Sequence, residues 1–258
     1  MQLRVQQYFN DVTDQLNNFR TVDLAEMEKA KLMNRLDNKF IISEKQLLRI
    51  MPQLAMYYSV LEINETRNHS YSSTYYDTAD NDMYLNHHNR RLNRFKIRQR
   101  VYNSSGDSFL EIKFKNNKGE TKKSRIETDE SFKNIPTKYF DFIADNTKYQ
   151  PITLRPVLEN EFYRFTLTNE KRNQRITVDT QINFWYKNKP LALPNLAIVE
   201  IKSTRDDLDR TIFNLLKESH VHPSSMSKYC IGMAMLQPEL KQNLFKRKIH
   251  AVNKICYA

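Results

Sequence analysis

Residues 94–100 read RFKIRQR, and positively charged side chains occupy every second position of this stretch. In a β strand successive side chains point to opposite faces, so the four cations would share one face. The aromatic and aliphatic residues between them would take the other face. A face of this kind either meets water or lines a site for a polyanion. The four cations are Arg94, Lys96, Arg98 and Arg100.

The same alternation recurs on other candidate strands, where charged residues lie opposite aliphatic or aromatic ones. A sheet with one apolar and one charged face is ordinary when the charged face is solvated. Its recurrence on at least six strands, from both ends of the chain, favours one common enclosed face instead. The other members of this face are Arg35, Asp37, Lys39, Glu111, Lys113, Lys115, Arg125, Glu127, Arg175, Asp179, Glu200 and Lys202.

Turn residues at 103–107 and 116–119 separate consecutive strands, so residues 93–128 are predicted to form an antiparallel meander. Helices are predicted over 1–34, over 43–54 with Ser43 as N-cap, over 136–146 and 207–219, and as a pair within 228–250. Strands are predicted over 34–42, 70–78, 93–102, 108–115, 122–128, 161–168, 174–186 and 196–203.

These elements predict an α+β fold in which a closed antiparallel β-barrel has helices packed outside it. Closure of the barrel would remove the exposed strand edges. We expect one domain over residues 1–258, with an N-terminal helical segment at 1–33 and a C-terminal helix at 237–258.

The composition of the chain points to an anionic partner. Lys and Arg number 41 against 30 Asp and Glu, which leaves a net charge of +11 over 258 residues. Nucleic acid, acidic lipid and phosphate-rich small molecules all fit this charge. The chain has only three glycines, at 106, 119 and 232, so it contains neither a P-loop nor a dinucleotide-binding glycine motif. A phosphate site here would therefore be built from side chains.

The chain has two cysteines, which lack the spacing of a zinc site, and it has no run of about 20 apolar residues. These features lead us to expect a cytoplasmic protein with no membrane span in this chain.

Eight short stretches follow one another between about residues 24 and 235: NRLDNKF, YSSTYYDTADNDMYLNHH, RFKIRQRVY, FLEIKFK, YRF, RITVD, VEIKS and SKY. In this order they resemble the VTC-type polyphosphate polymerase domain, a member of the triphosphate tunnel metalloenzyme (CYTH-like) superfamily. Two positions depart from the pattern. Asp37 stands where the superfamily usually has glutamate, and the PSSM segment before Ser227 lacks a base that relatives often carry.

The resemblance implies a tunnel whose basic lining grips a triphosphate and transfers the γ-phosphate of ATP to a growing polyphosphate chain. Mn²⁺ or Mg²⁺ would assist, and the partners would be ATP and inorganic polyphosphate, without nucleic acid. Carried over to this sequence, the catalytic cations would be Lys39, Arg98, Arg100, Lys113, Arg164 and Lys228. Further substrate contacts would be Arg125, Lys202 and Ser227, to which the charged alternation adds Arg175, and the metal ligands would be Glu200 and secondarily Glu111.

Three other functions remain open at this stage. The same tunnel can serve a metal-dependent triphosphatase that hydrolyses tripolyphosphate or nucleoside triphosphates, because only the acceptor differs. A polymerase needs a tunnel open at both ends, whereas a hydrolase works with one end closed. The charged face also fits a non-catalytic polyphosphate-binding module. A nucleic-acid-binding module fits the net charge but not the carboxylates among the cations, which would repel a phosphate backbone.

Overall fold

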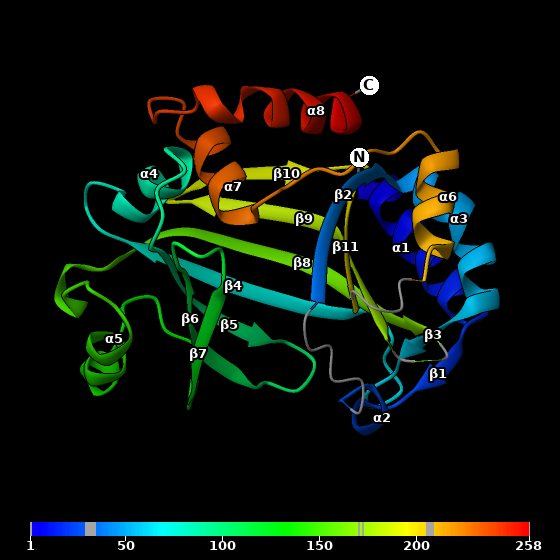
Figure 1. Ribbon diagram of the computed structural model, residues 1–258, viewed down its shortest axis with the longest axis horizontal. Helices are drawn as coiled ribbons and strands as arrows, with labels where there is room; N and C mark the ends of the chain where they lie inside the picture. Colours follow the sequence, from blue (N-terminus) through cyan, green and yellow to red (C-terminus); the bar gives the residue numbers. More distant parts are fainter. Residues whose placement is uncertain (1, 29–34, 170, 172, 205–208, 258) are drawn as a thin grey trace.

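The computed structural model describes residues 2–28, 35–169, 171, 173–204 and 209–257 (Figure 1). Within them eleven strands form one sheet, in which only the pairing of β1 with β3 is parallel. The strands are β1 Arg20–Val22, β2 Arg35–Ser43, β3 Tyr58–Leu61, β4 His69–Asp77, β5 Arg94–Tyr102, β6 Ser108–Lys115, β7 Thr121–Thr128, β8 Arg155–Asn169, β9 Gln174–Tyr186, β10 Lys189–Leu193 and β11 Leu196–Thr204.

The same residues form eight α helices and three short 3₁₀ turns. The helices are α1 Gln2–Leu16, α2 Leu24–Glu28, α3 Glu44–Tyr57, α4 Asp82–His88, α5 Phe140–Asn146, α6 Thr211–Glu218, α7 Lys228–Leu236 and α8 Lys246–Tyr257. The 3₁₀ turns are Thr137–Tyr139, Pro151–Thr153 and Asn243–Phe245.

The α+β class is confirmed, but strand pairing does not close the sheet into the expected barrel. The main path of the sheet runs β2-β11-β9-β8-β4-β5-β6-β7, and among the described residues no pairing joins β2 to β7. Both ends of this path cross the long strands β4 and β8 steeply (Figure 1). The result is a strongly curved sheet with an inner and an outer face, and the inner face carries the charged alternation.

All eight predicted strands are present, and β8 begins six residues earlier than the pattern indicated. Ser43 caps α3 as predicted: its Oγ accepts from the Gln46 amide at 3.2 Å, while the Gln46 side chain accepts from the Ser43 amide at 2.9 Å. The single helix expected over 1–34 is wrong, because β1 separates α1 from α2. Residues 29–34 and 207–208 of the predicted helices lie outside the described residues.

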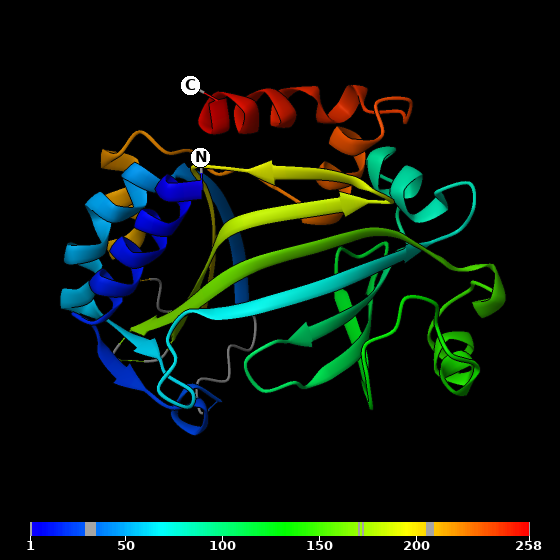
Figure 2. The ribbon, with the colours of Figure 1, turned by 180° about the vertical axis from the view of Figure 1, so that it is seen from behind.

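Helices α1, α3 and α6 cover part of the outer face of the sheet, as expected. Figure 2 shows α1, α3 and α6 gathered at one end of the sheet. Their apolar stripes bury Leu16, Leu47 and Leu216 against outward-facing residues of β8, β9 and β11 such as Phe165 and Val178. Burial of apolar surface drives this packing, so the outer face needs no further partner.

A β-bulge changes the character of the inner face along β9. Between the pairs Tyr163–Thr180 and Glu161–Asn183, β9 has one residue more than β8, and Gln181 takes a positive φ of 49°. The extra residue reverses which side chains point inward. Asp179 therefore faces inward before the bulge and Phe184 after it, so one end of the inner face is charged and the other is apolar.

Helix α7 lies in the apolar end of the inner face. Cys230 and Met233 are buried there, and Tyr229 stacks on Tyr75 of β4 with ring centroids 5.1 Å apart. A helix packed inside the curved sheet differs from the expectation that all helices pack outside. The apolar residues on nearly all sides of α7 explain why it is buried there.

Gly232 permits the close approach of α7 to the sheet. A β-carbon at this position would lie 2.8 Å from both Leu158 Cδ2 and Phe184 Cδ1, which are themselves buried. We expect Gly232→Ala to lower the free energy of unfolding by about 1–3 kcal/mol through overpacking. Urea denaturation measures this change, and Ala234→Gly in the same helix is the control for helix propensity. Unchanged stability of Gly232→Ala would show that α7 is loosely packed.

Candidate functional site

Charged residues from β2, β5, β6, β8, β9 and β11 line the inner face next to the N-terminus of α7. Strand register places them together: Lys39 lies opposite Glu200, Arg98 opposite Glu111, and Arg164 opposite Asp179. Directly opposite residues of an antiparallel pair project to the same face. The predicted residues thus come from strands far apart in the chain and share one concave surface.

Asp179 is the most enclosed acid of the site and binds two of the predicted cations. Arg164 donates to it through Nε and Nη2, at 2.5 and 2.9 Å, and Lys228 donates from the start of α7. The two cations hold the pKa of Asp179 well below its usual range despite burial. Phe162 lies beneath both, with its ring centroid 3.9 Å from Lys228 Nζ. Asp179 therefore fixes two cations whose remaining hydrogen-bond donors are left for a ligand.

Glu200 lies close to two lysines, Lys39 on the neighbouring strand β2 and Lys202 two residues further along β11. Its carboxylate is 3.1 Å from Lys39 Nζ and 4.0 Å from Lys202 Nζ. Although burial opposes ionisation, these positive charges lower the pKa of Glu200 to about 2. The carboxylate is therefore ionised across the physiological pH range.

Arg98 and Arg100 extend the cationic surface along β5. Arg98 donates to Glu111 on β6 through Nε at 2.6 Å and Nη2 at 2.5 Å. Arg100 is only 8% exposed, and its guanidinium lies over the rings of Tyr71 and Phe162, 5.5 and 5.8 Å from their centroids. Its Nε has no hydrogen-bond partner among the described residues. A buried donor of this kind is costly unless a ligand accepts from it.

Lys113 and Lys96 form a part of the face where positive charge is not balanced. They are directly opposite one another on β6 and β5, and neither forms an ion pair with any described residue. Lys96 Nζ donates instead to Ser227 Oγ at 2.8 Å, which also accepts from the Cys230 amide as the N-cap of α7. The charges of Lys39 on β2 and Glu200 on β11 both affect the pKa of Lys113 on β6.

Two predicted substrate contacts lie at the margins. Arg125 is exposed on the edge strand β7, where its guanidinium lies 4.9 Å from the centroid of the Phe109 ring. Arg175 is opposite Lys202 on the inner face, but its Nη2 donates to the Met27 carbonyl of α2 at 3.2 Å. Arg175 thus connects α2 to the sheet, so a role in ligand binding would be secondary to this contact.

Sequence reasoning left Lys96 and Asp179 out of the site. Both were visible in the alternation, Lys96 in RFKIRQR and Asp179 in RITVD. Their importance comes from contacts with Ser227 and Lys228, which are 131 and 49 residues away in the chain. No local pattern indicates such contacts.

The described acids of the site do not by themselves form a complete metal-binding site. Among the described residues no three histidine, cysteine or acidic side chains gather closely enough to hold an ion. Glu200 is nevertheless an ionised oxygen donor on the inner face. This donor set fits Mg²⁺ or Mn²⁺ bound by one or two carboxylates together with substrate phosphates and water.

Three lysines of the site are predicted to take up protons when an anion binds. Burial is the main cause that lowers the pKa of Lys228 to about 7 and those of Lys113 and Lys202 to about 8. A bound polyphosphate would raise these pKa values again, so binding takes up protons. We expect tripolyphosphate affinity to fall as the pH rises from 7 to 9.

Isothermal titration calorimetry at pH 8, in two buffers of different ionisation enthalpy, measures this proton uptake directly. Equal affinity at pH 7 and pH 9 together with no proton uptake would contradict the prediction.

Fold and site together define an α+β protein with a concave, cationic sheet face. A family model described as the VTC domain matches residues 34–237. The chain belongs to this family, which confirms the resemblance seen in the sequence. No curated protein matches the chain. None of the helices in the described ranges is long and apolar enough to cross a membrane.

Two solved structures resemble this chain at low sequence identity. A putative adenylyl cyclase from Hippeastrum, reported to have a dominant triphosphatase activity, is 14% identical with a TM-score of 0.50, over 82% of this chain and 99% of that one. A putative adenylate cyclase from Vibrio parahaemolyticus is 11% identical with a TM-score of 0.44, over 76% and 95% of the two chains. At this identity the Hippeastrum structure supports the fold alone.

Proposed function

We propose that this protein is an ATP-dependent polyphosphate polymerase. In this reaction the terminal oxygen of a polyphosphate chain attacks the γ-phosphorus of ATP, the bond to the β-phosphate oxygen breaks, and ADP leaves. The observation that carries the proposal is the inner face, where seven cations meet three acids in a VTC domain. The cations are Lys39, Lys96, Arg98, Arg100, Lys113, Arg164 and Lys228.

Phosphoryl transfer depends mostly on positioning and on stabilisation of charge, which this face can supply with side chains alone. Arg164 and Lys228 are held by Asp179 and would orient one part of the chain of phosphates. Arg98 and Arg100 would bind the non-bridging oxygens, while Lys113 and Lys96 would neutralise the charge that develops during transfer. Arg125, Lys202 and Ser227 would contact phosphates at the margins.

A divalent metal is part of the proposal. Bound Mn²⁺ or Mg²⁺ would neutralise phosphate oxygens and align them for in-line transfer. Glu200 would be its protein ligand, while Glu111 is a secondary candidate because Arg98 already occupies its carboxylate.

We expect Glu200→Gln to lower activity about a hundredfold or more and to remove its dependence on Mn²⁺ concentration. The substitution keeps the shape of the side chain but removes the charge that attracts the metal. Titration of activity with Mn²⁺ measures this effect, and Glu62→Gln, which removes an acid paired with Arg67, is the control. A normal metal titration for Glu200→Gln would exclude Glu200 as the ligand.

A triphosphatase is the second candidate, and the position of α7 favours it. The helix fills the apolar end of the inner face, so this end is not open to a chain running straight through. A hydrolase that uses water as acceptor tolerates one closed end. A polymerase requires a different way out for its product.

One incubation distinguishes these functions. Purified protein is mixed with ATP and Mn²⁺, and ADP, free phosphate and exopolyphosphatase-sensitive polymer are measured. A polymerase yields ADP and polymer, whereas a triphosphatase yields free phosphate without polymer. Neither product, combined with tight polyphosphate binding, would indicate a binding module and overturn the catalytic proposal.

A further inference from the structure

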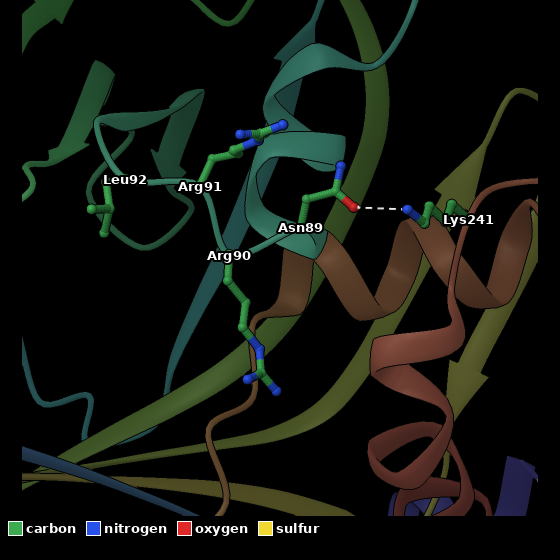
Figure 3. Close-up of a pocket in the computed structure, with 5 residues that line it drawn as sticks. All are labelled: Asn89, Arg90, Arg91, Leu92 and Lys241. Atoms are coloured by element: carbon green, nitrogen blue, oxygen red, sulfur yellow. Dashed lines mark hydrogen bonds between the residues drawn. The ribbon is translucent and has the colours of Figure 1, made fainter.

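Positive charge continues beyond the inner face, onto the surface next to α4. An open pocket of about 730 Å³ lies there, lined by Asn89, Arg90, Arg91, Leu92 and Lys241, with three cations and no acid (Figure 3). Lys241 Nζ donates to Asn89 Oδ1 at 3.1 Å, which joins the segment after α7 to the end of α4. The charged residues of this pocket have no role in the site described above.

Lys248 on α8 connects the pocket to the inner face. Its Nζ donates to Ser225 Oγ at 2.8 Å, two residues before the Ser227 that holds Lys96. Partial burial and the charge of Arg90 both lower the pKa of Lys248. In Figure 3 the Arg90 side chain extends away from that of Arg91. Lys96 and Lys248 are thus held by two serines of one short segment, two residues apart in the chain.

The pKa of His87 is affected by cations of both regions. Burial and the positive charges of Lys96, Arg94 and Lys248 lower the pKa of His87 to about 2. The charges of inner-face cations and of Lys248 on α8 thus act on one side chain. The chain from Lys96 to Arg91 can span at most about 18 Å, a length that a few consecutive phosphates can cover.

The ion pairs of the site divide it into two parts. Lys39, Arg98, Arg164 and Lys228 are each paired with an acid. In contrast, the cations of the outward route are not paired with acids in any described contact, namely Arg90, Arg94, Lys96, Lys241 and Lys248. Unbalanced positive charge attracts a flexible polyanion more strongly than charge that is already neutralised.

We infer that Arg90, Lys241 and Lys248 form a second binding segment, outside the curved sheet, for the part of a long polyphosphate chain that has left the inner face. This inference rests on the proposed function, since it concerns the product of a polymerase. This segment also gives such a product a lateral path out of the inner face, whose apolar end is filled by α7.

Polyphosphate suits this segment better than nucleic acid does. Single-stranded nucleic acid binds where aromatic side chains stack on its bases. The lining of the pocket contains no aromatic side chain, and its exposed apolar residue is Leu92. A polymer that consists only of charged phosphate units needs no such platform.

The test compares two ligands and two triple variants. Arg90→Ala, Lys241→Ala and Lys248→Ala are combined in one protein. The control combines Lys45→Ala, Arg49→Ala and Lys217→Ala, which remove the same charge from α3 and α6 on the outer face. Affinity for tripolyphosphate and for long-chain inorganic polyphosphate is measured by calorimetry at several salt concentrations, with single-stranded DNA as a competitor.

We expect the first triple variant to bind long-chain polyphosphate about three- to thirtyfold more weakly, with tripolyphosphate affinity unchanged. The slope of log affinity against log salt should become shallower by about two. Equal loss in the control variant, equal loss for tripolyphosphate, or a loss confined to DNA would overturn the inference. Failure of the wild-type protein to bind tripolyphosphate would instead refute the proposed function, so the two failures are distinguishable.

Discussion

Lys113→Ala is expected to lower turnover of ATP at least about a hundredfold without loss of stability. The Lys113 side chain is exposed toward the interior of the curved sheet and forms no ion pair with a described residue. Desolvation and the repulsion from Lys96 and Lys123 lower its pKa. Removing Lys113 therefore deletes a phosphate-binding charge while relieving like-charge repulsion in the empty protein.

Steady-state kinetics and urea denaturation measure the two effects separately. Lys122→Ala is the matched control, because Lys122 is an exposed lysine of β7. The neighbouring Lys123 lies opposite Lys113 in the strand register, so Lys122 points to the other face of the sheet. The control should keep both activity and stability. Full activity of Lys113→Ala, or a large loss of stability, would remove Lys113 from the proposed site.

The second large effect is expected for Asp179→Ala, and it concerns stability. The Asp179 side chain is 5% exposed, and its loss would leave Arg164 and Lys228 buried without a counter-charge. Breaking a buried ion pair by removing one partner typically costs about 3–5 kcal/mol. Urea denaturation should show this loss. Added tripolyphosphate should restore more stability to Asp179→Ala than to the wild-type protein, because phosphates replace the missing negative charge.

Asp129→Ala is the control for this experiment. Asp129 pairs with Lys138 on the surface, where both side chains are exposed, so its removal should change stability far less. Equal stability of the Asp179→Ala and Asp129→Ala proteins would contradict the role of Asp179. Equal stabilisation of the Asp179→Ala and wild-type proteins by tripolyphosphate would show that Arg164 and Lys228 do not face the ligand.

Much of this architecture can be predicted from the alternation of charged and apolar residues. The period of two in RFKIRQR and FLEIKFK identifies β5 and β6 and correctly places Arg98 and Glu111 on the charged face, where the structure puts them opposite one another. This works because the pattern is local and the outer face must be apolar to bury the helices. The short motifs, which follow one another in the order typical of the family, also indicated the family. The match to the VTC domain model confirms it.

The alternation could not predict how the inner face ends. The bulge at Gln181 inserts one residue into β9, and this reversal of phase turns Phe184 inward, where α7 packs. Similarly, Asp179 resembles one more acid of a solvated face until Lys228 approaches it from a helix 49 residues later. Contacts between distant segments decide both features, and a pattern within one strand does not contain them.

A crystal structure with tripolyphosphate and Mn²⁺ tests the central claim most directly. We expect the phosphates within the concave face, with their oxygens contacting Arg98, Arg100 and Lys113, and the metal bound to Glu200. Phosphates bound only on the exterior of the sheet, with Arg100 still lacking a hydrogen-bond partner for its Nε, would contradict the assignment of this face as the polyphosphate site.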